Sequence, residues 1–155
     1  MKNHLYLFLI SLFLFSCANP GSIQWKKVSV SDLEGQAVDL SQYEGKRIFL
    51  NIWATWCGPC RAEMPSMEAA RVELEDENFV FVALSDESWK QIKTFKESTG
   101  YGFEFLRLND PIKSLGIFSI PQTYIINSKG EVVKSVNGSM DWSSKESLSF
   151  LQSIP

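Results

Sequence analysis

Histidine and cysteine are scarce in this sequence. The 155 residues include a single histidine, His4, and three cysteines. His4 lies in an N-terminal stretch that we expect to be removed, which would leave the mature protein without histidine. The absence of histidine excludes catalysis by Ser-His or Cys-His pairs and removes the commonest protein ligand of zinc and copper. We therefore expect neither a metal site nor a metal cofactor.

An excess of either charge is also missing. The formal net charge is −3, with 15 basic and 18 acidic residues. Nucleic-acid binding needs a basic patch, so we expect no nucleic-acid partner. The hydrophobic fraction of 45% is normal for a packed core. The length suits one globular domain, which we expect to be a monomer.

The longest apolar run, Leu5–Phe15, is too short to cross a bilayer. As a helix it would extend roughly 16 Å, about half of the hydrocarbon core. A run of this length after a polar, lysine-containing start is typical of a signal peptide. We therefore expect residues 1–16 to be a cleaved leader.

The end of that run resembles a bacterial lipoprotein box. Leu14 stands three residues before Cys17 and the small Ser16 directly before it, although Phe15 is bulkier than usual. We predict a lipid on Cys17, a tether over residues 17–24 and a folded domain over residues 25–155. Ala18 in place of a retention aspartate favours the outer membrane. The alternatives are a plain signal peptide with an incidental cysteine and a short uncleaved anchor.

Hydrophobic patterning predicts an α/β domain in which strands and helices alternate. The expected strands are 28–32 and 36–40, a hairpin around Gly35, then 46–53, 79–84, 103–108, 122–127 and 131–137. The expected helices are 59–77, 88–99, a brief one with Asp110 as its N-cap and Pro111 as its first residue, and a last one with a capping box of Ser143 and Glu146. In helix 88–99, Trp89, Ile92, Phe95 and Thr99 are expected to face the core. The order describes a mixed sheet with helices on both faces.

Cys57-Gly58-Pro59-Cys60 is the motif that carries chemistry. It lies where a buried strand is expected to turn into a helix, so Cys57 would sit at the helix N-terminus, where the helix dipole favours a thiolate. Pro59 suits the first helical turn. Cys57 would attack a substrate disulfide and Cys60 would resolve the mixed disulfide. A zinc site lacks two further ligands, and a purely structural disulfide over so short a loop would add little stability.

The surrounding residues resemble a known family. Trp53 to Cys60 is similar to the thioredoxin superfamily signature, and Asn51-Ile52-Trp53 together with Arg61 to Pro65 resembles its TlpA/ResA-like branch. Ile120-Pro121-Gln122-Thr123 resembles the cis-proline loop of that family. The resemblance implies a thioredoxin-like mixed β-sheet flanked by helices, with an N-terminal β-hairpin and a helix-strand insertion between residues 85 and 121.

The resemblance also implies roles for residues around the pair. Trp56 matches a tryptophan that packs beside the nucleophile, and Pro121 matches the cis-proline that faces the disulfide. Ile120 would then line a substrate groove and offer its backbone for strand-like pairing. The alternative for Pro121 is an ordinary trans proline at the edge of a strand.

Asn51 and Glu63 are two polar residues expected to lie near the cysteine pair. Asn51 stands where thioredoxin has a buried aspartate, and it cannot take up a proton, so we expect a hydrogen-bonded core amide. Glu63 lies one turn after Cys60 and matches a glutamate that this branch places beside the active site. There it would raise the thiol pKa values by like-charge repulsion and exchange protons with the pair. The alternative is a solvated helix residue.

The function indicated is thiol-disulfide exchange outside the cytoplasm by a membrane-tethered oxidoreductase. Gly-Pro between the cysteines is the dipeptide of the reducing thioredoxins, so reduction is the expected direction. The redox-active disulfide needs no other cofactor. The expected partners are envelope proteins with disulfides, such as apocytochrome c, and a thiol electron donor in the membrane. Alternatives are a peroxiredoxin-type thiol peroxidase, and a redox-inert binding module or metallochaperone.

Overall fold

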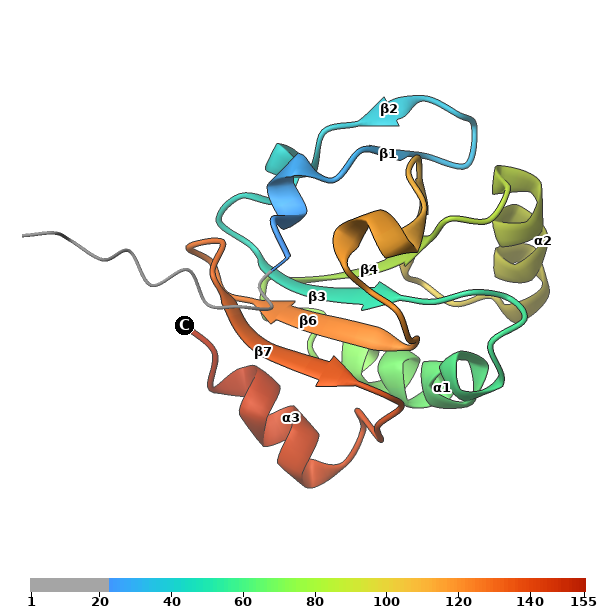
Figure 1. Cartoon of the computed structure of the whole chain (residues 1–155). Helices are drawn as coiled ribbons and strands as arrows, with labels where there is room; N and C mark the ends of the chain where they lie inside the picture. Colours follow the sequence, from blue (N-terminus) through green and yellow to red (C-terminus); the bar gives the residue numbers. More distant parts are fainter. Residues whose placement is uncertain (1–22) are drawn as a thin grey trace, which may run out of the picture.

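The computed structural model describes residues 23–155, so the predicted leader and Cys17 lie outside the described residues. The centre of the fold is a seven-stranded mixed sheet in the order β2-β1-β5-β4-β3-β6-β7 (Figure 1). The strands are β1 (Val30–Ser31), β2 (Ala37–Val38), β3 (Arg47–Ile52), β4 (Phe79–Ser85), β5 (Glu104–Leu108), β6 (Gln122–Ile126) and β7 (Val132–Asn137). The predicted α/β class is confirmed.

The two central strands, β3 and β4, are parallel and buried on both faces. Alternate side chains of β3 point to opposite faces, as the pleat of a strand requires. Phe49 faces one hydrophobic cluster, while Ile48 and Leu50 face the other. Continuous apolar runs are what a two-sided core demands, which is why both strands were predictable.

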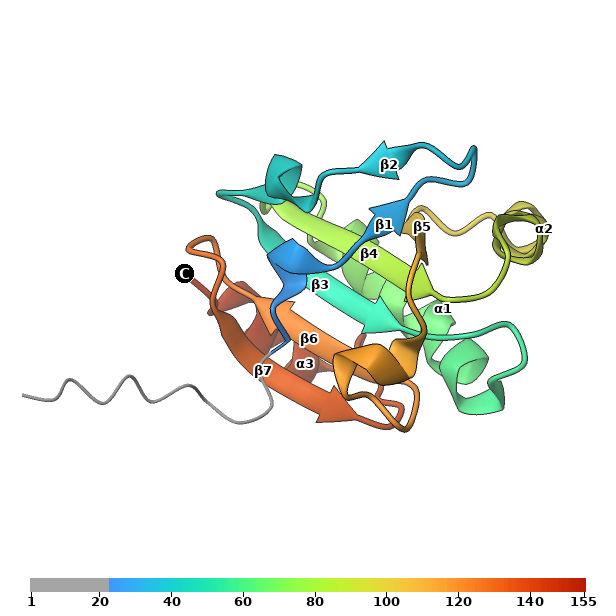
Figure 2. The ribbon, with the colours of Figure 1, turned by 45° about the horizontal axis from the view of Figure 1, so that its top comes forward.

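The three α-helices, α1 (Gly58–Glu73), α2 (Trp89–Thr99) and α3 (Lys145–Gln152), pack against the same cluster and therefore the same face of the sheet (Figure 2). The other face is covered by three short 3-10 turns, η1 (Trp25–Lys27), η2 (Leu40–Tyr43) and η3 (Ile112–Leu115). The expectation of helices on both faces is thus met on the second face only by 3-10 turns.

Helix α2 closely matches its predicted bounds, but two of the side chains expected to face the core are exposed. Ser88 caps it by accepting from the Gln91 amide, and the Ser88 amide donates in return to the Gln91 side chain. Gly100 ends the helix with φ of 69°. Ile92 is buried and Phe95 packs on Trp53 at 4.6 Å between ring centroids. Trp89 and Thr99 are exposed, contrary to the expected apolar stripe. The core meets only the middle of the helix, so its first and last residues project into solvent.

The predicted N-caps of the last helix and of the turn after Asp110 are wrong, because nearby side chains make different hydrogen bonds. The N-cap of α3 is Ser144, because Ser143 instead donates its N–H and hydroxyl to Asp141. Asp110 does not cap the turn η3, whose amide at Ile112 donates to Asp86 Oδ2 at 3.0 Å. Helix α1 also ends at Glu73 rather than 77. Neighbouring acidic and hydroxyl side chains compete for the same free N–H groups, and spacing alone does not choose between them.

Candidate active site

Cys57 and Cys60 form a disulfide at the start of α1, with their Cα atoms 5.3 Å apart. Strand β3 ends at Ile52, and the chain turns through a bond from the Cys57 amide to the carbonyl of Ala54. Cys57 is the N-cap of α1, and its Sγ accepts from the amide of Cys60 at 3.2 Å. The Cys60 N–H at the helix N-terminus therefore points at this sulfur, and together with the helix dipole it stabilises a thiolate when the pair is reduced.

The two sulfurs differ in their access to solvent. Cys57 is 4% exposed, Cys60 is fully buried, and Gly58 and Pro59 between them are exposed. Only Cys57 can be reached by a large substrate, which is the asymmetry that attack followed by internal resolution requires. Trp56 is 72% exposed, so its indole stands in solvent directly before the pair rather than in the core.

The Ile120-Pro121 peptide bond is cis, as the family resemblance implies. The carbonyl oxygen of Ile120 lies 3.7 Å from Cys57 Sγ, so this loop faces the pair directly. Pro121 is buried and Ile120 half-buried. Phe118, two residues earlier, is 81% exposed and was not singled out from the sequence.

Glu63 is buried, with 3% of its surface exposed, so the solvated alternative is wrong. Its Oε1 accepts from Asn51 Nδ2 at 2.9 Å, and its Oε2 accepts from the amide of Met140 at 3.1 Å and from Trp142 Nε1 at 3.2 Å. Burial raises the pKa of the Glu63 carboxyl, while these three donors act in the opposite direction. Burial outweighs the donors, so the pKa of this carboxyl lies above its ordinary value.

Asn51 is the hydrogen-bonded core amide that the sequence led us to expect. It is fully buried on β3, and its Nδ2 donates both to Glu63 and to Thr123 Oγ1, the latter at 2.9 Å. Its Oδ1 is buried with no hydrogen-bond partner among the described residues. The amide therefore links β3, β6 and α1 below the redox pair.

The loop before Cys57 is held by a residue that sequence reasoning missed. Glu87, two residues after the end of β4, accepts from the Thr55 amide and the Thr55 hydroxyl, each at 2.6 Å. Ser85 and Gln91 donate to the same carboxylate at 3.1 and 3.4 Å. No motif marks Glu87, and only its position across the sheet edge from Thr55 reveals the contact.

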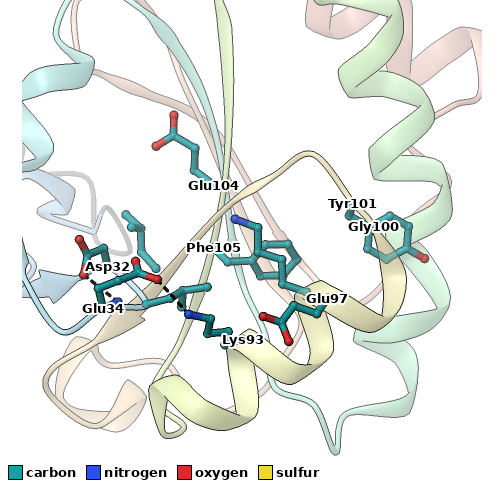
Figure 3. A pocket seen from close by; sticks show the side chains of 11 residues that line it. Asp32, Glu34, Lys93, Glu97, Gly100, Tyr101, Glu104 and Phe105 are labelled. Atoms are coloured by element: carbon teal, nitrogen blue, oxygen red, sulfur yellow. Dashed lines mark hydrogen bonds and ion pairs between the residues drawn. The ribbon is translucent and has the colours of Figure 1, made fainter.

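A separate hollow of about 520 Å³ lies between the β1–β2 turn, α2 and β5 (Figure 3). Lys93 reaches across it to Glu34, with Nζ 3.2 Å from Oε1. Acidic and basic side chains are mixed around it, and it contains no residue of the redox pair. This hollow is not part of the disulfide site.

Comparison with known proteins places this geometry in a family. A model of the AhpC/TSA family matches residues 23–135. The chain belongs to the AhpC/TSA family. Among curated relatives, the thiol-disulfide oxidoreductase ResA of Bacillus thuringiensis is 32% identical over 112 residues, 70% of this chain. The match spans 65% of that relative's own length. The predicted resemblance to the ResA-like branch is confirmed.

Solved structures of similar proteins share this fold. A Bacteroides vulgatus protein provisionally described as a thiol-disulfide oxidoreductase superposes with a TM-score of 0.70 at 27% identity, covering 82% of this chain and 91% of that one. The exposed lipoprotein thioredoxin of Streptococcus pneumoniae gives 0.62 at 26% identity, covering 81% and 98%. Within residues 23–155, no helix is long and apolar enough to cross a membrane.

Proposed function

We propose that this protein is a membrane-tethered thiol-disulfide oxidoreductase that reduces disulfides of envelope proteins. The observation that carries the proposal is the Cys57–Cys60 pair at the N-terminus of α1, with the more accessible sulfur facing the cis-proline loop. The ResA relatives and the lipoprotein thioredoxin support the activity and the location.

In the proposed cycle, the Cys57 thiolate attacks one sulfur of a client disulfide. The other client sulfur leaves as a thiolate and takes up a proton. The Cys60 thiolate then attacks Cys57 Sγ, which releases the second client sulfur and leaves the Cys57–Cys60 disulfide. Two electrons pass from the protein to the client. A membrane dithiol protein would return the pair to its reduced form.

The neighbours have defined tasks in this cycle. The helix N-terminus stabilises the Cys57 thiolate, and the Ile120 backbone offers strand-like pairing to a client segment. A charged Glu63 opposes ionisation of the thiols by like-charge repulsion and can pass protons to or from the pair. Apocytochrome c before haem attachment is one client of the required chemistry. The expected lipid on Cys17 would keep the domain near the membrane.

Reduction of insulin disulfides with dithiothreitol as electron source tests the proposal. The wild-type protein should accelerate insulin precipitation, and Cys57→Ser should abolish that activity. Cys60→Ser should accumulate a mixed disulfide with client proteins, detected by mass spectrometry after trapping in cells. Activity that survives both substitutions contradicts the exchange mechanism. Consumption of hydrogen peroxide faster than reduction of insulin would favour the peroxidase alternative.

A further inference from the structure

Trp142 is a buried tryptophan in contact with the acidic residue of the site. It lies in the loop between β7 and α3 and is fully buried. Its ring stands edge-on to Phe49 of β3, with centroids 4.7 Å apart and planes at 84°. Its Nε1 donates to Glu63 Oε2 at 3.2 Å, and the amide of Met140 donates to the same oxygen at 3.1 Å. One loop thus supplies two of the three donors to this carboxylate.

That loop is fixed at both of its ends. Ser66 of α1 accepts from the Trp142 amide at 3.1 Å and donates to the Glu63 carbonyl at 2.8 Å. At the other end, the Gly138 amide donates to the Pro121 carbonyl at 2.9 Å, next to the cis bond. The indole N–H is therefore aimed at Glu63 by contacts with both α1 and the cis-proline loop.

We propose that Trp142 is a positioning residue for Glu63: its indole N–H holds the carboxyl group in place beside the redox pair and favours its charged form. The inference rests on the proposed function, because it gives Glu63 a task in thiol chemistry. A buried carboxylate is costly unless donors satisfy it, and hydrogen bonds to a charged acceptor are roughly twice as strong as neutral ones.

The surroundings of Glu63 leave few other groups that could set its charge. Asn51 from β3 and, beyond it, Thr123 from β6 are uncharged, and Cys60 lies one turn earlier on α1. A hollow of about 430 Å³ connects Glu63 to solvent. Among the described residues lining it, the other charged side chain is Asp141, which is exposed and bonded to Ser143. Trp142 and Met140 are therefore the main polar contacts on that side.

The test replaces Trp142 by Phe, which keeps an aromatic ring against Phe49 and removes the donor. Titration of carboxyl-¹³C-labelled Glu63 would be followed by NMR in the oxidised protein, with its signal assigned by its absence in Glu63→Gln. The midpoint should move to higher pH in Trp142→Phe, because burial is then opposed by two donors instead of three. An unchanged midpoint overturns the proposal.

Trp53→Phe is the matched control. Trp53 is also fully buried, but its Nε1 has no hydrogen-bond partner within residues 23–155. Losing this indole should leave the Glu63 midpoint where it is in the wild type. An equal shift in both variants would mean that Glu63 responds to general loosening of the core, and the positioning role would be rejected.

Two further readouts complete the test. In the wild-type protein, the NMR signal of the Trp142 indole proton should shift with pH at the same midpoint as Glu63, and this shift should be absent in Glu63→Gln. This readout does not depend on whether Trp142→Phe folds.

The reduction potential of the disulfide, measured against thiol buffers across pH, should change slope at the pH where Glu63 titrates. That change of slope should move to higher pH in Trp142→Phe. Different midpoints for the indole proton and Glu63, or a change of slope at the same pH in both proteins, contradict the proposal. Failure of the insulin assay alone would count against the proposed function and leave the titration result intact.

Discussion

Glu63 is the residue whose surroundings decide most about pH dependence. Its carboxyl is 3% exposed and its pKa is raised above the ordinary 4.5 because burial outweighs three hydrogen bonds. A raised folded-state pKa means that the stabilising effect of this group is present at low pH and is lost as pH rises through the folded pKa. Ionised Glu63 therefore lowers the stability of the fold near neutrality.

Glu63→Gln should consequently change how stability varies with pH. The variant does not titrate at this position, so it should become more stable relative to the wild type, with a larger free energy of unfolding, as pH rises above 4.5. Urea unfolding at several pH values measures that trend. The amide also misplaces one donor, which adds an offset that does not depend on pH. A difference between the two proteins that stays constant across the range contradicts the expectation.

At the scale of elements, the junction between β3 and α1 depends on Glu87, which accepts twice from Thr55 at 2.6 Å. Glu87→Ala leaves the Thr55 amide and hydroxyl without this acceptor, and should cost about 1–3 kcal/mol of unfolding free energy. Insulin reduction should slow, because the loop that presents Cys57 is no longer held. Urea unfolding and the insulin assay measure the two effects.

Glu34→Ala provides a control for that experiment. Glu34 pairs with Lys93 on the surface, with side chains 60% and 43% exposed. Exposed ion pairs contribute little to stability, so this variant should unfold and react nearly as the wild type does. Equal losses in the two variants would show that Glu87 does not anchor the loop.

The elements were predictable where a single local signal decides them. Continuous apolar runs identified β3 and β4, and the spacing of Cys57 and Cys60 identified the start of α1. The coverage of the second face by 3-10 turns was not predictable, because those turns carry no periodic pattern. The partners of Glu63 were also hidden, since Trp142 and Met140 lie far along the chain and meet it only through folding. Lone residues in a polar loop give no sequence signal for such a contact.

For the whole molecule, the direction of electron transfer is linked to stability. A pair that reduces its clients favours its own disulfide form, whereas strong oxidants have a stabilised reduced form. The folded protein should therefore stabilise its disulfide relative to the unfolded chain. Urea unfolding should show a higher midpoint for the oxidised protein than for the protein kept reduced with dithiothreitol. A higher midpoint for the reduced protein would contradict the proposed direction.

The unequal covering of the sheet has a practical consequence for protein engineering. The disulfide and Trp142 belong to the cluster on the α-helical side, and Glu63 is hydrogen-bonded to Trp142 there. The opposite side is covered by η1, η2 and η3 and supplies none of these groups. Dyes, affinity tags or fused domains attached through the exposed residues of η2 would be separated from the redox chemistry by the full thickness of the sheet. Attachment on that side should therefore immobilise the protein with its redox site accessible.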